Sequence, residues 1–453
     1  MSSMIPEREQ QNHCRQAKSH WNGRKHHVVL RERFHMQLYQ AETSTVLKSE
    51  DAAIATVICE GGVRAHATGF GGGMVMLLHD RNKNETLVIS AYSAAPRTAT
   101  EETFVTNPAL AEIGCSAYKL TITEGEIFRD LYHAAFLRRL AIARDPVELF
   151  YRGEIANQIV LEMKQRGGLL TKVDLASYET NIEKPIEVRL SNGYTLRGPQ
   201  PPSSFTALSL LVDTMMSRFW SESNITMDAS YLRELLKAQQ LALSRLEELG
   251  DLEYMLNDPV TQVLQAPQNS TSYDASHEEK IADIRNLMWN LKDQGSVGSH
   301  INVMDGGGLA VALSSSLNER FGSVRRSVKG GFVWNNEMSS FTIPDKEKSE
   351  DIHVNAVEGR KRPRSSMMPL MVFDEAGQVK LTFSNKMCFN VTSQVIENLC
   401  YEGERPFRAS VETMSPLPLR TRRSQCDSEM PLRYHQVSVE RMICIGPRYL
   451  SLG

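Results

Sequence analysis

The sequence lacks several features that would place it in a common class. Its seven cysteines never form a CxxC pair, which excludes the usual zinc-ribbon and thioredoxin patterns, and an odd number indicates no disulfide framework. No apolar run reaches the roughly 18 residues that a membrane helix needs. No apolar signal-peptide core is visible in the opening residues either. A net charge of −3 favours neither nucleic acid nor an anionic membrane. We therefore expect no metal, no cofactor and no nucleic-acid partner.

The first 47 residues are polar, basic and rich in histidine. Pairs such as His26-His27 are a candidate metal site, but their spacing matches no ligand pattern. We expect a disordered basic arm over residues 1–47 instead. The stretch 404–453 is rich in Arg, Ser and Pro, and we expect little order there.

Between these ends, helical and strand patterns alternate irregularly. Apolar periodicity predicts helices over 50–62, 128–143, 148–168, 205–216, 230–249 and 390–401. Strands are predicted over 74–80 and 86–92, in hairpins over 186–198 and 370–383, and in a pair around the turn Gly306–Gly308. The dipeptide Asn192-Gly193 is the strongest of the hairpin signals. This mixture favours a layered α+β sandwich over a doubly wound parallel sheet.

Glycines 71–73 are a candidate phosphate cradle, but a phosphate loop needs Lys-Ser/Thr at the start of a helix. Here an apolar strand follows, so close packing of a strand and a helix is the better interpretation.

Several long segments, in order, resemble one enzyme family. They are DAAIAT, ATGFGGG, AYSAAPRTA, LFYRGEIANQIVLEMKQRGGLLTKVDLASYE, RGPQPPSS, SHINV followed by AVALSSSLNERFGS, VWNNEMSSF and RKRPRSSMMP. They cover most of residues 48–118 and 145–400 and resemble the gamma-glutamyltransferase (glutathione hydrolase) family. The resemblance implies a four-layer αββα sandwich of the N-terminal-nucleophile hydrolase type, with part of the helical layer missing. It also implies a precursor that cuts itself, so that a Thr at the new N-terminus attacks the gamma-glutamyl amide of glutathione.

Four family roles fall on unsuitable residues. The Gly-Thr-Ser/Thr-His motif at the cut reads Val297-Gly298-Ser299-His300, so the nucleophile position is Gly298. The Arg that clamps the glutamyl carboxylate falls on Tyr92, which has no bidentate fork. The acidic pair that holds the α-amine falls on Ser339 and Ser340, and the oxyanion Gly-Gly falls on Met387 and Cys388. The resemblance therefore implies impaired catalysis.

Other family positions keep polar residues. Ser316 matches the Thr that supports the nucleophile, and Asn318 matches the Asn beside it. Glu337 matches the residue that binds the amine, although it could equally be a solvated loop charge. Ser365 and Ser366 match the serine pair that contacts the carboxylate. A polar cup is therefore predicted to survive.

Three local alternatives remain. Ser299 could replace the missing nucleophile, but a one-residue slip in a strand turns the side chain to the other face. His300 could be a general base or a packed strand histidine. The basic run 360–362 with Arg364 could bind an anion, mimic a nuclear signal, or belong to the loop that covers the pocket in the family.

The resemblance also divides the chain. It implies a large-subunit-like region over 48–297, incomplete around 107–145, and a small-subunit-like region over 298–403. The family acts at the extracellular face of the plasma membrane, and four N-x-S/T sequons, at Asn84, Asn224, Asn269 and Asn390, suit such a location.

Three functional hypotheses follow. The chain is a glutathione hydrolase with an unorthodox serine, a non-catalytic homologue that binds a gamma-glutamyl molecule weakly or pairs with an active family member, or a decayed gene product that folds poorly.

Overall fold

The computed structural model describes residues 25–31, 36–42, 49–106, 130–219, 229–265, 296–342 and 353–383. The predicted helix 390–401 and the region 404–453 lie outside these residues, as do the sequons at Asn224, Asn269 and Asn390.

A seven-stranded antiparallel sheet forms the centre of the molecule, in the order β2-β1-β8-β9-β3-β4-β5. Its strands are β1 (Lys25–Arg31), β2 (Met36–Glu42), β3 (Gly73–Asp80), β4 (Glu85–Ala91), β5 (Asn181–Glu183), β8 (Ser296–Asp305) and β9 (Leu309–Glu319). The long strands β3, β8 and β9 lie side by side, and β8 pairs with β9 on both sides of Gly298, whereas β1 pairs with β8 only from Ile301 to Asp305.

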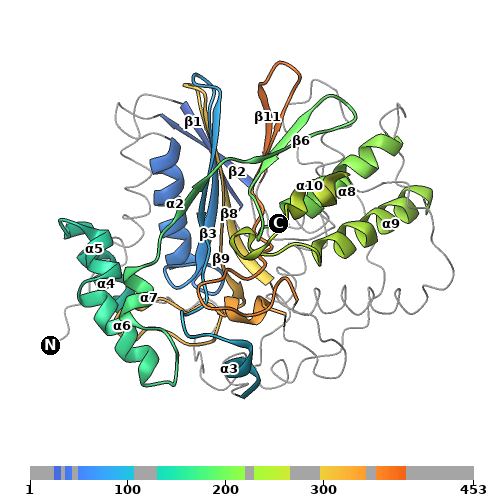
Figure 1. The fold of residues 1–453 in the computed structure, drawn as a ribbon. Helices are drawn as coiled ribbons and strands as arrows, with labels where there is room; N and C mark the ends of the chain where they lie inside the picture. Colours follow the sequence, from blue (N-terminus) through green and yellow to red (C-terminus); the bar gives the residue numbers. More distant parts are fainter. Residues whose placement is uncertain are drawn as a thin grey trace.

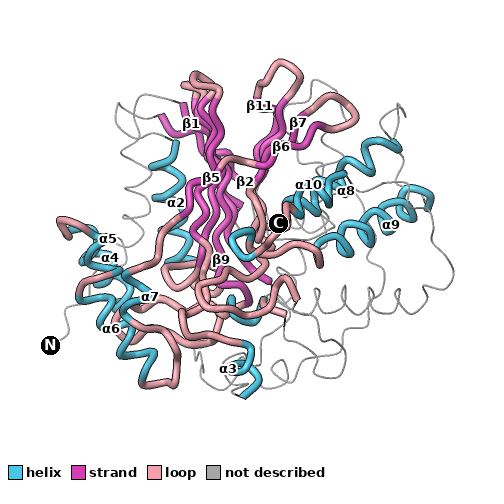
Figure 2. The backbone as a smooth tube through the Cα atoms, in the orientation of Figure 1, coloured by secondary structure: helices cyan, strands magenta, loops and turns pink. Residues whose placement is uncertain are grey.

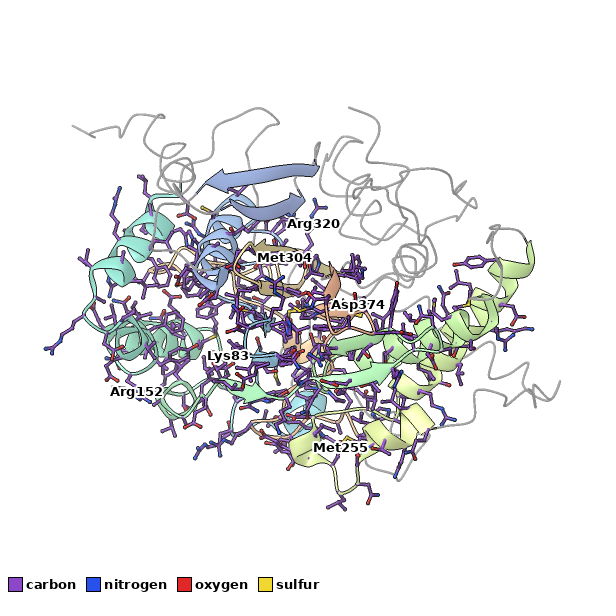
Figure 3. The ribbon with its side chains drawn as sticks, turned by 90° about the horizontal axis from the view of Figure 1, so that it is seen from above. Lys83, Arg152, Met255, Met304, Arg320 and Asp374 are labelled. Atoms are coloured by element: carbon purple, nitrogen blue, oxygen red, sulfur yellow. The ribbon has the colours of Figure 1, made fainter. Side chains whose placement is uncertain are left out.

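A second, four-stranded antiparallel sheet packs against the first (Figure 2). Its order is β11-β10-β7-β6, with β6 (Ile186–Arg189), β7 (Thr195–Gly198), β10 (Leu370–Phe373) and β11 (Val379–Phe383). Between the sheets, Met371 and Phe373 of β10 pack against Val75 and Leu77 of β3. Figure 3 shows this interior from above, with Met304 of β8 near its centre.

Helices cover both outer faces, which completes four layers. Helix α2 (Ser49–Val63) lies on the first sheet, where its small residues Ala52 and Ala53 contact Ile301 and Val303 of β8. Helices α8 (Phe205–Phe219), α9 (Ala229–Leu246) and α10 (Pro259–Gln265) cover the second sheet. The predicted αββα sandwich is therefore confirmed.

A small helical group lies beside α2 (Figure 1). It contains α4 (Leu131–Ile142), α5 (Pro146–Tyr151), α6 (Glu154–Lys164) and α7 (Lys172–Ala176). Phe136, Ile155 and Ile159 form its core together with Phe332. The remaining short helices are α3 (Glu101–Thr106), η2 (Leu252–Tyr254) and η4 (Glu337–Ser340).

Two local predictions are wrong. The predicted single helix over 148–168 is two helices, α5 and α6, which meet at Gly153. A Cβ there would lie 3.0 Å from Leu149 Cα and Leu149 O, so a side chain at this bend would crowd the backbone of α5. Within the predicted disordered arm, β1 and β2 are strands, and β1 pairs with β8 from His26–Asp305 to Leu30–Ile301. The run Val28-Val29-Leu30 has the branched residues that suit a strand.

Candidate functional site

Gly298 lies inside β8 at an irregular point of the sheet. Val297 pairs with Asn318 and Ser299 pairs with Ser315, so the register shifts between them. Gly298 is buried. A Cβ added at this position would lie only 2.9 Å from the carbonyl oxygen of Ser315. The strand is therefore fitted to a residue without a side chain.

The two candidate nucleophile positions face opposite layers. The Cβ direction of Gly298 points to the ring of His300, 3.7 Å away, on the face between the two sheets. Ser299 is fully buried on the other face, where its Oγ donates a hydrogen bond to Glu60 Oε2 of α2 at 2.9 Å. Alternation along the strand thus directs the Ser299 hydroxyl into the helix–sheet contact and away from the space between the sheets.

His300 packs within the sheet. It pairs with Ser314 of β9, and its Nδ1 lies 3.1 Å from the Ser314 Oγ, which is itself fully buried. This geometry supports the interpretation of His300 as a packed strand histidine.

Tyr92 follows β4 and joins the apolar cluster between the sheets. Its side chain is 3% exposed. Burial raises the pKa of Tyr92, and the nearby carboxylates of Glu183 and Glu337 raise it further. Because β9 and β3 separate β8 from β4, Tyr92 lies three strand spacings, about 14 Å, from Gly298. The clamp position thus holds a neutral phenol, with Glu183, Glu337 and Arg362 near it.

A compact hydrogen-bonded network joins the end of β9 to η4. The Ser316 Oγ accepts a hydrogen bond from the Asn318 backbone N–H at 2.7 Å. Asn318 has a positive φ of 76°, which asparagine tolerates better than most residues. Its amide donates to the Asn336 carbonyl oxygen at 3.3 Å and to the Ser339 Oγ at 3.2 Å. Ser316, Asn318 and Ser339 therefore do come together.

Glu337 begins η4 and is 6% exposed. Its backbone N–H donates to the Asn335 Oδ1 at 2.9 Å, and the Asn335 amide donates to the Gly71 carbonyl at 2.6 Å. Because the Glu337 side chain is buried, it is not a solvated loop charge. Its carboxylate also raises the pKa of Tyr92, which agrees with a position close to that ring. Ser340 instead uses its carbonyl, which accepts a hydrogen bond from Asn355 at 2.8 Å.

The serine pair lies beside the start of α8. Ser365 is 5% exposed, and its carbonyl accepts hydrogen bonds from the Ser204 N–H and Oγ, both at 3.0 Å. The Ser365 hydroxyl accepts from the Met367 N–H at 3.2 Å. Ser366 is half-buried. Ser365 thus serves a loop contact within the structure, while Met387 and Cys388 lie outside the described residues.

The basic loop is held by acidic partners. Arg364 forms an ion pair with Glu247, with its Nη1 2.9 Å from the Oε1, and His353 Nε2 lies 3.2 Å from the Glu247 Oε2. Although burial raises the pKa of Glu247, hydrogen bonds from His353 and Arg364 lower it to about 2. The backbone N–H of Arg362 donates to Asp251 at 2.8 Å. These contacts favour a fixed structural loop over an anion site.

Sequence patterns missed the contacts that join α2 and the segment after it to the sheet. The Thr68 Oγ1 and the Ser315 Oγ lie 2.6 Å apart, and Arg64 approaches both Glu60 and Ser299 at 3.5 Å. Glu60 and Arg64 are one helical turn apart in sequence, which is the only signal that could have found them. Among the residues that the structure describes, no group of three His, Cys, Asp or Glu could hold a metal ion, and no helix could cross a membrane.

Known proteins match this chain over most of its length. The family described as Gamma-glutamyltranspeptidase matches residues 48–120 and 108–406. Glutathione hydrolase 2 of Arabidopsis thaliana is 26% identical over 407 residues, covering 73% of this chain and 69% of that protein. The Glutathione hydrolase proenzyme of Escherichia coli (strain K12) is 28% identical over 270 residues, covering 57% of this chain and 46% of that protein.

The fold has solved counterparts. Cephalosporin acylase from Bacillus halodurans superposes with a TM-score of 0.57 at 20% identity, covering 74% of this chain and 72% of that chain. At this identity the likeness concerns the fold alone. Together with the family match over more than half of the chain, the sheet order and the retained polar network lead to one conclusion: the chain belongs to the gamma-glutamyltranspeptidase family.

Proposed function

We propose that this chain is a non-catalytic member of the family, which neither cuts itself nor forms a glutamyl ester. The observation that carries the proposal is Gly298, which has no hydroxyl and fits its strand closely against Ser315. In the family reaction a hydroxyl oxygen must add to the amide carbon while the amine leaves with a proton. Gly298 offers no atom that can make that bond.

Ser299 is a poor substitute for a physical reason. Its Oγ donates to a buried carboxylate on the α2 face, so reaching the space between the sheets would require the strand to rotate or slip. Either movement would break the pairing of β8 with β9 and expose Ile301 and Val303.

The retained polar residues support weak ligand binding as a residual role. Glu337 matches the position that binds the glutamyl amine, and Asn318 keeps the family Asn, but no arginine fork stands at Tyr92 to hold the carboxylate. We therefore propose that glutathione binds weakly or not at all. Pairing with an active relative and an extracellular membrane location remain further parts of the proposal.

Two measurements on the purified full chain test it. Incubation with a gamma-glutamyl anilide should release no more aniline than the Ser299→Ala variant releases, because neither protein has a placed nucleophile. Turnover by the natural chain that Ser299→Ala abolishes would establish the serine hydrolase instead. A melt without a cooperative transition would favour the decayed gene product.

A further inference from the structure

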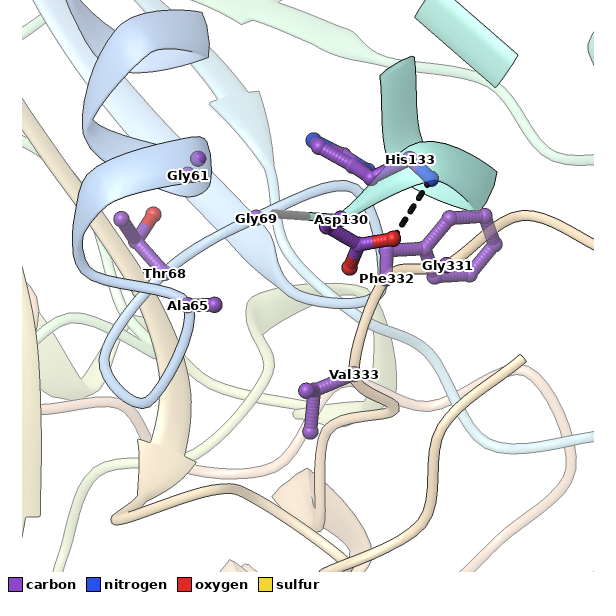
Figure 4. A pocket seen from close by; sticks show the side chains of 10 residues that line it. Gly61, Ala65, Thr68, Gly69, Asp130, His133, Gly331, Phe332 and Val333 are labelled. Atoms are coloured by element: carbon purple, nitrogen blue, oxygen red, sulfur yellow. Dashed lines mark hydrogen bonds between the residues drawn. The ribbon is translucent and has the colours of Figure 1, made fainter. Parts of the chain in front are cut away.

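A hollow lies on the α2 side of the first sheet, between the end of α2 and the start of α4 (Figure 4). Glycines at 61, 62 and 69 line one side of it, and His133, Phe332 and Val333 line the other. Thr68, which also lines it, binds Ser315 on the face of the sheet opposite to the Gly298 Cβ direction. The hollow is therefore separate from the site described above.

His133 lines this hollow and has a buried nitrogen without a hydrogen-bond partner among the described residues. The side chain is 7% exposed, and this nitrogen is its Nε2. Its Nδ1 lies 3.4 Å from the Gly330 carbonyl oxygen, which favours the tautomer with the proton on Nδ1. Figure 4 shows the ring directed from α4 toward the end of α2. Nε2 is then a buried hydrogen-bond acceptor.

Charges around the ring are already balanced. Burial lowers the pKa of His133, so the imidazole is neutral near pH 7. Asp130 accepts a hydrogen bond from the His133 backbone N–H at 2.8 Å and forms an ion pair with Arg326. With Phe332 and Val333 as apolar walls, the surroundings favour an uncharged ligand that carries one hydrogen-bond donor.

The space available limits the ligand to a few atoms. The hollow has a volume of about 20 Å³. One bound water needs roughly 10–15 Å³. Gly62, which lines the hollow, is exposed, and a Cβ added there would meet no atom within 4 Å, so we take the mouth of the hollow to lie beside Gly62.

We propose that this hollow binds the hydroxyl group of a small neutral alcohol, which donates its hydrogen bond to the Nε2 of His133. The apolar end of the alcohol rests against Phe332 and Val333 and extends toward the mouth at Gly62. The site does not depend on the proposed loss of catalysis, because it lies on the other face of the sheet.

Fluorine NMR of the full chain tests the site, with 2,2,2-trifluoroethanol at millimolar concentration as the probe. Its methyl ether, which has the same fluorinated group and no donor, is the matched control. We expect saturable binding of the alcohol and about tenfold weaker binding of the ether, since one buried hydrogen bond contributes about 1 kcal/mol or slightly more.

Two variants separate the site from non-specific effects. His133→Phe keeps an aromatic ring for the contact with Phe136 and removes the acceptor, so it should weaken alcohol binding about tenfold. Gly62→Leu fills the open mouth and should abolish binding without loss of the cooperative melt. Equal binding of alcohol and ether, full binding by folded His133→Phe, or no saturable binding to the natural chain would each overturn the proposal.

Discussion

Replacing Gly298 by threonine restores the side chain that the family places at the cut, and its effect follows from the strand geometry. The new Cβ would lie 2.9 Å from the Ser315 carbonyl oxygen, closer than real Cβ contacts allow, and 3.7 Å from the His300 ring. The β8–β9 pair must therefore separate locally. Overpacking of this kind costs about 1–3 kcal/mol.

The expected result of Gly298→Thr is a destabilised protein without recovered chemistry. At roughly 2–4 °C per kcal/mol for a large domain, its melting temperature should fall by roughly 2–12 °C. The chain should stay uncut on a denaturing gel, and release of aniline from a gamma-glutamyl anilide should stay at background. Tyr92 still replaces the carboxylate clamp, and Ser340 still replaces an acidic residue.

Gly298→Ala is the matched control, because it adds the same Cβ without a hydroxyl. Both variants should melt lower than the natural chain, with the threonine variant at least as low as the alanine variant. An unchanged melting temperature for both would show that the strand is not fitted to glycine. Self-cleavage or turnover by Gly298→Thr alone would show that the other losses matter little.

Three further variants probe the surrounding contacts. Ser299→Ala removes the donor to Glu60 and should lower the free energy of unfolding by about 1–2 kcal/mol in urea titrations; no change would argue against the α2-facing serine. Glu247 has a folded pKa of about 2 against an ordinary 4.5, so its stabilisation is present above pH 4.5 and is lost as the pH falls toward 2. Glu247→Gln should therefore be less stable at pH 7 and show a flatter acid limb; a difference between the two proteins that does not change with pH would contradict this. Burial lowers the pKa of His133 below 6.5, so protonation favours the unfolded state and stability falls as the pH drops below 6.5. Unfolding of His133→Phe at pH 5 and 7.5 should show less of that loss, and an equal loss would place the acid sensitivity elsewhere.

Local patterns predicted much of the fold because each has a local cause. The Asn192-Gly193 turn formed its hairpin, with Gly193 at a φ of 87°. Successive side chains of a strand point to opposite faces of the sheet. Ser299, one residue after Gly298, therefore faces the side opposite to the Gly298 Cβ direction, as the sequence predicted.

Features that depend on distant parts of the chain could not be predicted. The contact of Arg364 with Glu247 joins residues 117 positions apart, and neither neighbourhood indicates the other. The hollow beside His133 forms where α2, α4 and a loop near Phe332 meet, so no single stretch of sequence carries its signal.

Intact-mass spectrometry of the purified full chain, after incubation with a gamma-glutamyl anilide, tests the absence of a nucleophile most directly. We predict one unmodified species at the mass of the whole polypeptide, 51.0 kDa. Two fragments that divide before Gly298 or Ser299, or a glutamyl group attached to either residue, would contradict it.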